Sequence, residues 1–247
     1  MTSPISIRAG LAQLLLLSAV GCGGDSKRAS DAGVADASQI DAASDTWDID
    51  QDGVPELVAV DYIDVTALER ISRFRSGEGH DYADDYEDCR SMKHYFQPKA
   101  ELDWSTLVIQ APVSGTVSRI EEEWAGTQIE IQLASHPAFR IILFHVVLSA
   151  PLSLGDEVSS GQPLGHHVGN QTFSDIAVAV TDQSFRLRLL SYFDLTTDDV
   201  FAAYQARGVE LRDELTITQE ERDLDPLVCD GELFATPGEI DNWIELD

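Results

Sequence analysis

Residues 79–96, GHDYADDYEDCRSMKHYF, concentrate chemically capable side chains in a short stretch. They include two His, four Asp, one Glu, one Cys and four aromatic residues within eighteen positions. Imidazole, carboxylate and thiolate groups are the usual protein ligands of transition metals. His80 and Asp84 lie four positions apart, whereas Cys89 has no partner in a C-x-x-C motif. The stretch therefore indicates a candidate metal site, in which His80 and Asp84 are better ligands than Cys89.

The other charged residues of this stretch have a simpler interpretation. Asp85, Glu87 and Asp88 are close in sequence to Arg90 and Lys93. Exposed ion pairs of this kind are common and contribute little stability. We therefore expect these five residues to form a solvated, paired face.

The chain begins with an export signal. Arg8 precedes the apolar run LAQLLLLSAV, and small residues follow before Cys22. Such a run is too short to span a bilayer and is typical of a signal peptide, here residues 1–21. The sequence AVGC that ends at Cys22 resembles a bacterial lipobox, which implies a lipid on Cys22 and a membrane anchor. Gly23 resembles signals for onward transport, so we expect a cell-envelope lipoprotein at the outer membrane or cell surface. An unlipidated signal is the alternative, and it also leads to export.

The net charge excludes some classes of partner. The chain has 44 acidic and 16 basic residues and a net charge of −28 at pH 7. Phosphates would be repelled at every approach, so nucleic acid and anionic lipid surfaces are excluded as partners. A solvated acidic surface or cation binding is expected instead.

Cys89 and Cys229 are the two cysteines that remain after Cys22. In an oxidising compartment we expect them to form a disulfide. Two unpaired thiols are the alternative, because a sequence does not give the separation of the two residues in space.

Two acidic segments precede the folded part of the chain. Residues 22–46 contain mainly small and acidic side chains, which cannot offset the entropy of folding, so we expect a disordered tether. Residues 47–59 place acids at alternate positions before Gly53, as in a calcium loop. The candidate calcium ligands are Asp48, Asp50, Asp52 and Glu56. Ala59 stands at the twelfth position, so this is not an EF-hand, and an acidic linker end is the alternative.

From Leu107 onward, short runs rich in Val and Ile are separated by Gly, Pro, Ser and Asn, as is typical of antiparallel strands. The expected strands lie within residues 107–113, 115–124, 127–135, 139–148, 161–168, 174–180 and 186–193. A helix is expected over 196–208, and Thr218 with Glu221 forms a capping box for a second. The sequence thus predicts a mainly β fold, with an antiparallel sheet domain over 60–195 and a helical C-terminal extension over 196–247.

Two phrases among the expected strands carry a family resemblance: APVSGTV (111–117) and GDEVSSGQPLG (155–165). Biotinyl or lipoyl-type carrier and adaptor domains have similar phrases but a much shorter gap between them. Here 37 residues separate Val117 from Gly155, and the turn has no Lys to modify. The spacing resembles the lysostaphin-type (LytM-like) zinc metallopeptidases, which cut peptide cross-links in bacterial cell walls. The resemblance implies a β-sandwich-like sheet domain and a zinc cofactor.

The resemblance also assigns roles to individual residues. The H-x-x-x-D motif that opens the family's site matches His80 and Asp84, which would be zinc ligands. The family's Y-x-H-L strand matches LFHV, so His145 corresponds to the catalytic His that positions water and stabilises the oxyanion. The closing H-x-H motif falls on Asp175 and Ala177. Asp175 therefore corresponds to the His that assists as a base, and Ala177 to the third zinc ligand.

Alanine cannot ligate a metal, and two protein ligands hold catalytic zinc poorly. We therefore expect an exported, lipid-anchored protein whose incomplete peptidase-like site binds peptidoglycan or a cell-envelope partner without cutting. One alternative is an active zinc endopeptidase with a rearranged ligand set, in which Asp175, His166 or His167 joins His80 and Asp84. A second alternative is an adaptor module without such a site.

Overall fold

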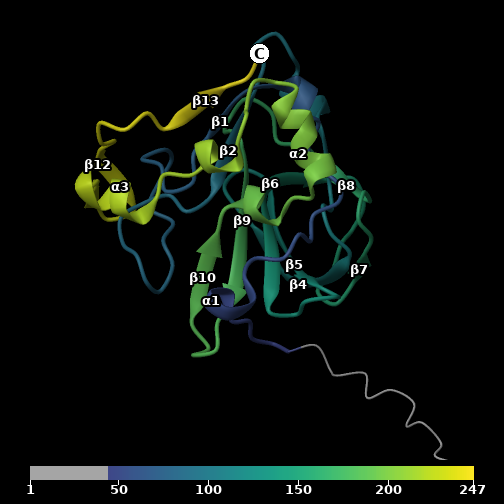
Figure 1. Cartoon of the computed structure of the whole chain (residues 1–247). Coiled ribbons are helices and arrows are strands. Elements are labelled where there is room, and N and C mark those ends of the chain that lie inside the picture. The colour runs from purple at the N-terminus through teal and green to yellow at the C-terminus, as the bar shows by residue number, and fades with distance from the viewer. Residues whose placement is uncertain (1–43) are drawn as a thin grey trace, which may run out of the picture. The chain divides into compact units, whose positions relative to one another are not determined.

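An antiparallel sheet of eleven strands organises residues 44–247, the part of the chain that the computed structural model describes (Figure 1). The signal peptide, the lipid-anchor residue Cys22 and nearly all of the tether lie outside these residues. No helix within 44–247 is long and apolar enough to cross a membrane. The mainly β, antiparallel fold expected from the sequence is confirmed.

The strands are β1 (Leu68–Ser72), β2 (His94–Pro98), β3 (Val108–Gln110), β4 (Gly115–Glu122), β5 (Thr127–Leu133), β6 (Phe139–Leu148), β7 (Glu157–Val158), β8 (Pro163–His167), β9 (Ser174–Thr181), β10 (Leu187–Leu190), β11 (Val228–Asp230), β12 (Leu233–Thr236) and β13 (Trp243–Glu245). The α-helices are short: α1 (Ile49–Asp52), α2 (Asp198–Gln205) and α3 (Gln219–Leu224). The main path of the sheet runs β13–β1–β2–β9–β6–β5–β4–β7. β10 pairs with β9, β8 pairs with β3 and β6, and β11 with β12 forms a separate hairpin.

The strands expected beyond Leu107 are present as β3 to β6 and β8 to β10. The structure adds β1, β2, β7 and β13, and β2 begins inside the polar stretch 79–96. Both expected helices are present, α2 capped by Thr197 and α3 by the predicted Thr218–Glu221 capping box. The segment 196–247 is not only helical, because it also supplies β11, β12 and β13, and β13 pairs with β1.

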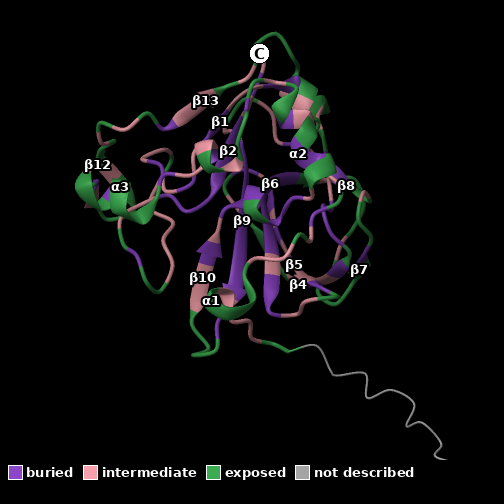
Figure 2. Cartoon of the chain, in the orientation of Figure 1, coloured by how far each residue is buried: buried purple, intermediate pink, exposed green. Residues whose placement is uncertain are grey.

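β9 separates two apolar clusters. Ile176 and Val178 belong to the main core, whereas Ala177 and Ala179 belong to a smaller second cluster. Successive side chains of a strand point to opposite faces, so β9 contributes to both clusters. Figure 2 shows β6 and β9 as mainly buried strands at the centre of the sheet. Asp175 lies in β9, two positions before Ala177, and is completely buried.

The disulfide expected from the sequence is present between Cys89 and Cys229, which are 140 residues apart. It joins the loop before β2 to β11. Closing so long a loop removes much of the conformational freedom of the unfolded chain. The disulfide thus holds two segments together that the sheet itself leaves unpaired.

Replacing both Cys89 and Cys229 with Ser should lower the free energy of unfolding by about 3–5 kcal/mol in the chain-entropy model. Urea unfolding at pH 7 measures the change. Reductant should cause the same loss in the native chain and none in the double variant. Equal stability of the native chain and the double variant would contradict this account.

His94 in β2 is a core histidine with both ring nitrogens engaged. Its Nδ1 lies 2.8 Å from the carbonyl oxygen of Ser72, and its Nε2 lies 2.9 Å from Oγ of Ser191. The side chain is completely buried. Burial lowers the pKa of His94 from 6.5 to about 4, so the ring is neutral at pH 7.

The buried His94 predicts a pH-dependent stability. Between pH 6.5 and about 4 the unfolded chain binds a proton at this residue and the folded chain does not. The contribution of neutral His94 to the free energy of unfolding is therefore fully present above pH 6.5. It is lost as the pH falls through about 4, by about 3 kcal/mol in total. His94→Gln should flatten the decline of unfolding free energy between pH 7 and 4.5, measured by urea titration at each pH. His136→Gln, in the turn between β5 and β6, is the matched control and should keep the native slope. An unchanged slope in His94→Gln would refute the assignment.

Candidate functional site

A cleft of about 620 Å³ opens beside the second apolar cluster, which contributes Tyr82 and Phe144 to its wall. The remaining wall comes mainly from the segment before β2, from β2, from the β4–β5 turn and from the β11–β12 hairpin. The disulfide fastens this hairpin to the segment that carries His80. His80 and His145, two of the residues selected from the sequence, both line this cleft.

Lys93 is buried in the wall of the cleft and is 2% exposed. Its Nζ lies 2.5 Å from Oδ2 of Asp175 and 3.4 Å from Nε2 of His80. Nδ1 of His80 lies 2.9 Å from the carbonyl oxygen of Asp81. If Nδ1 donates its proton to that carbonyl, the lone pair of His80 is on Nε2 and accepts from the ammonium group. An internal cation therefore occupies the space between an imidazole and a carboxylate.

Three aromatic rings complete the surroundings of this ammonium group. Nζ of Lys93 lies 4.2 Å from the ring centroid of Phe144 and 5.0 Å from those of Tyr82 and Tyr95. Aromatic faces attract cations, and more so where water is excluded. Burial is the largest single influence and disfavours the charged form of Lys93. The charge and hydrogen bond of Asp175, together with Tyr95 and Tyr82, outweigh it, so the pKa of Lys93 lies above its ordinary value.

His145 lies at an irregularity in β6. Its backbone has φ of 60°, a conformation that is uncommon for residues other than glycine. β6 pairs with β9 up to Leu143 and with β8 from Val146 onward, so His145 stands where the strand changes partner. A Cβ atom on Gly126 would lie 2.9 Å from the carbonyl carbon of His145, so only glycine fits opposite the irregularity. Such bulges redirect side chains and are frequent next to functional sites.

The redirected imidazole of His145 lies between two carboxylates. Its Nε2 is 3.3 Å from Oδ1 of Asp175, and its Nδ1 is 3.3 Å from Oε2 of Glu123. Nδ1 also lies 2.9 Å from the carbonyl oxygen of Ala125. The structure thus brings together His145 and Asp175, the two residues to which the family resemblance assigns catalytic roles. Those roles remain predictions.

Asp84 does not lie in this cleft and is not placed as a ligand beside His80. One of its carboxylate oxygens accepts from the backbone N–H groups of Tyr86 and Glu87, at 2.9 and 3.1 Å. The other accepts from the N–H of Leu189 in β10, at 3.0 Å. The expectation that Asp84 ligates a metal is therefore corrected: the carboxylate fixes the loop 84–87 against β10.

Ala177 belongs to the second apolar cluster, and neither His166 nor His167 supplies the missing ligand. Nδ1 of His166 lies 3.3 Å from Oγ of Ser149. His167 is buried, and its Nδ1 accepts from the backbone N–H of Gly169. Burial lowers the pKa of His167. Within residues 44–247, no three His, Cys, Asp or Glu side chains are placed to hold a metal ion.

The zinc that the family resemblance implies therefore does not fit these residues. Asp84 is committed to backbone groups, and the free nitrogen of His80 faces the ammonium group of Lys93. Asp175, the candidate replacement ligand, pairs with the same ammonium. A zinc ion there would have to displace the charge of Lys93, and the remaining donors are too few for a stable site.

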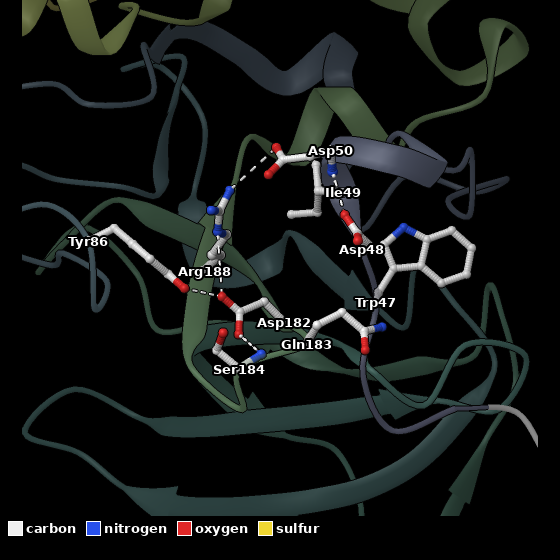
Figure 3. Close-up of a pocket in the computed structure, with 9 residues that line it drawn as sticks. All are labelled: Trp47, Asp48, Ile49, Asp50, Tyr86, Asp182, Gln183, Ser184 and Arg188. Carbon is white, nitrogen blue, oxygen red and sulfur yellow. Dashed lines mark hydrogen bonds and ion pairs between the residues drawn. The ribbon is translucent and has the colours of Figure 1, made fainter.

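The expected calcium ligands also do not converge. Asp48 caps α1 by accepting from the backbone N–H groups of Asp50 and Gln51, both at 3.1 Å. Figure 3 shows that the carboxylate of Asp50 is directed instead toward Arg188, at 3.9 Å. Asp52 and Glu56 are exposed on the surface. This segment forms a helical turn against β9 and β10 instead of a calcium loop, because its acids cap the helix or pair with Arg188.

The charged face expected within 85–93 is also corrected. Glu87 is buried and pairs with Arg75 and Arg90, at 2.7 and 2.6 Å. Lys93 pairs with Asp175 in β9 rather than with its acidic neighbours in sequence. These pairs are structural parts of the loop that carries His80.

Some site residues were not selected from the sequence: Lys93 as a buried cation, and Glu123 and Trp124 in the β4–β5 turn. These two turn residues end the run SRIEEEW (118–124), just before Gly126. Alternation places Lys93 and Tyr95 on one face of the chain. The sequence carried no signal that this face would meet Asp175, which is 82 residues away.

Comparisons with known proteins give a likeness of fold. The chain is similar to a candidate glycyl-glycine endopeptidase, LytM, from Ruminococcus gnavus ATCC 29149, with 12% identity, a TM-score of 0.33, and coverage of 42% of this chain and 43% of that chain. It is also similar to a chain in the SpoIIQ–SpoIIIAH pore-forming complex, with 15% identity, a TM-score of 0.37, and coverage of 54% and 88%. The match thus spans less than half of the Ruminococcus chain. No family model and no curated protein matches the sequence. This distant likeness assigns no activity or partner to the chain.

The pairing of Lys93 with Asp175 predicts a large effect of removing the cation. Lys93→Met keeps the length of the side chain but leaves a buried carboxylate without its partner, which should cost about 3–5 kcal/mol of unfolding free energy. Asp175→Asn should also destabilise the chain. The double variant should lose less than the sum of the two, with a coupling energy of about 2 kcal/mol or more.

Urea unfolding of the native chain and the three variants gives the full cycle. Lys99→Met, one position beyond β2, is the control and should change the unfolding free energy by less than about 0.5 kcal/mol. Additive effects of the two substitutions would show that the ion pair does not form.

Proposed function

We propose that this protein is an exported, lipid-anchored binding protein of the cell envelope that uses a LytM-like domain without peptidase activity. Its cleft would take peptidoglycan peptide or a cell-envelope protein as ligand. The observation that carries the proposal is the position of Lys93, whose ammonium group pairs with Asp175 and lies 3.4 Å from Nε2 of His80. Unlike a zinc ion, an ammonium group in this position cannot act as a Lewis acid that coordinates a substrate carbonyl and an activated water.

The partners of the other site residues support the same proposal. A zinc peptidase needs a metal that polarises the carbonyl and lowers the pKa of bound water. Here Asp84 is engaged by three backbone N–H groups, and Ala177 lies in an apolar cluster. The alternative of an active enzyme with a rearranged ligand set would require these interactions to break together. The alternative of a simple adaptor leaves the buried polar cluster at His145 without a use.

Export and anchoring rest on the sequence of residues 1–22 and on the disulfide. Cys89 and Cys229 are bonded, as expected for a protein outside the reducing cytoplasm. A lipid on Cys22 would place the cleft at the end of the tether 22–46. That arrangement suits a protein that searches for an insoluble polymer or a neighbouring envelope protein.

The proposal predicts binding without hydrolysis. The mature chain with Cys22→Ser, incubated with purified peptidoglycan sacculi, should sediment with them and release no new amino termini. After dialysis against zinc, it should retain far less than one zinc per chain. His80→Ala is the matched variant, and its zinc content should equal that of the native chain.

Two results would overturn the proposal. One is release of amino termini that a zinc chelator stops. The other is one zinc per native chain that is lost in His80→Ala. Either would establish the active metalloenzyme instead.

A further inference from the structure

The cleft carries an excess of negative charge once its internal ion pair is counted. Asp81, Glu123 and Glu232 all line it. The positive charge of Lys93 is matched by Asp175, which is fully buried beside it. The three outer carboxylates are thus left without a cation of their own in the cleft.

Glu123 is the least satisfied of these carboxylates. Its Oε2 is buried and has no hydrogen-bond partner among the described residues. Nδ1 of His145 lies 3.3 Å from this oxygen, but that nitrogen is also 2.9 Å from the carbonyl oxygen of Ala125. Burial raises the pKa of Glu123, although the nearby His145 opposes the shift. An incoming cation would therefore stabilise the ionised form of this side chain.

A second buried group in the cleft also has no partner. Tyr95 is only 4% exposed, it lines the cleft, and its hydroxyl makes no hydrogen bond within the described part of the chain. Oδ1 of Asp175, which is buried and does not itself line the cleft, also makes no hydrogen bond with a described residue, although Nε2 of His145 lies 3.3 Å away. Buried polar atoms normally have partners, so such a cluster indicates a donor that arrives with a ligand.

Aromatic faces accompany these acceptors. Trp124 in the β4–β5 turn is 74% exposed and also lines the cleft. Its ring centroid lies 5.7 Å from that of His145. An exposed indole next to a carboxylate is a suitable surface for a cation. The ammonium group of Lys93 already lies against the rings of Tyr82, Tyr95 and Phe144 in the same wall.

We propose that the cleft binds a primary ammonium group carried by a peptide, with Glu123 as the counter-ion and Trp124 as the aromatic face. The proposal rests on the proposed function and names the ligand class of the same cleft. An ammonium group has three donors that can reach separate acceptors, whereas a guanidinium prefers a single carboxylate in a bidentate pair. A neutral sugar would leave the charge of Glu123 without compensation.

The test is a titration of the mature chain carrying Cys22→Ser with the peptide acetyl-Ala-Lys-Ala-amide, followed by amide chemical shifts. The same peptide with an acetylated Lys side chain should bind at least about tenfold more weakly, because it lacks the charge-assisted hydrogen bond. Glu123→Gln should weaken binding of the lysine peptide by a similar factor. Trp124→Ala should weaken it by about three- to fivefold, as expected for a cation at an exposed ring.

Two control variants carry the same types of substitution at residues outside the cleft. Glu121→Gln removes a carboxylate from β4 that pairs with Arg119. Phe185→Ala removes another aromatic side chain that is 80% exposed, in the β9–β10 turn. Both should bind the lysine peptide within about twofold of the native chain. Should Glu123→Gln fail to fold, Glu232→Gln on the exposed hairpin replaces it and should weaken binding in the same direction.

Sacculi with free and with chemically acetylated amines separate this inference from the proposed function. Binding of the lysine peptide and of untreated sacculi, both lost on acetylation, supports the inference. Binding of the lysine peptide but not of sacculi also supports it and makes an envelope protein the ligand.

Equal binding of acetylated and free sacculi, without binding of the lysine peptide, overturns the inference and leaves the proposed function standing. Absence of binding to both the peptide and the sacculi overturns the inference and removes peptidoglycan as the ligand.

Discussion

The buried ion pair between Lys93 and Asp175 is the interaction on which the site depends. Both side chains are almost completely excluded from water, at 2% and 0% exposure. Such charges are costly to bury, and either one alone would be more costly than the pair. Because Lys93 precedes β2 and Asp175 lies in β9, the pair forms only when these neighbouring strands are in register. The correct pairing of these strands and the neutralisation of the buried Lys93 are therefore linked.

The segment that carries His80 is held in place by interactions that need no metal. The disulfide joins it to β11, Asp84 attaches it to β10, and Glu87 forms ion pairs with two arginines. A bound zinc ion commonly holds its ligand loops together and adds folding free energy. In this chain a covalent bond, a carboxylate cap and buried ion pairs supply that stabilisation. The cleft can therefore keep its shape without a metal.

The sequence predicted those features that depend on local pattern. Alternating Val and Ile located the strands beyond Leu107, and Thr218 with Glu221 located α3, because capping and alternation involve residues close in the chain. β2 escaped detection because its strand HYFQP lies in a polar, charged segment. Motif spacing placed His145 and Asp175 in one site, and they lie 3.3 Å apart. Motif spacing did not predict the place of Asp84, because a carboxylate four positions after His80 can equally be a metal ligand or a loop cap.

Lys93 illustrates why the remainder of the site could not be predicted. Near neighbours such as Asp88 made a surface pair the simplest expectation, since charge patterns are interpreted along the chain. The actual partner is 82 residues away and meets Lys93 only through strand pairing. The role of Glu123 could not be predicted for a similar reason. Its position in the site depends on the irregular backbone at His145 and on Gly126, which lets the β4–β5 turn approach β6. Both effects depend on contacts between segments that are distant in the sequence.

The charge balance around Lys93 decides which ligands the cleft attracts. A zinc ion with an open position carries local positive charge and attracts carbonyl oxygens and anions. Lys93 brings a single charge, and Asp175 cancels it at short range. The potential of the cleft is then set by the outer carboxylates of Asp81, Glu123 and Glu232, within a chain whose net charge is −28. Such a field concentrates cations and repels anions, and low-dielectric walls strengthen it. The preference for positively charged ligands that we propose thus follows from the neutralisation of Lys93 by Asp175 at short range.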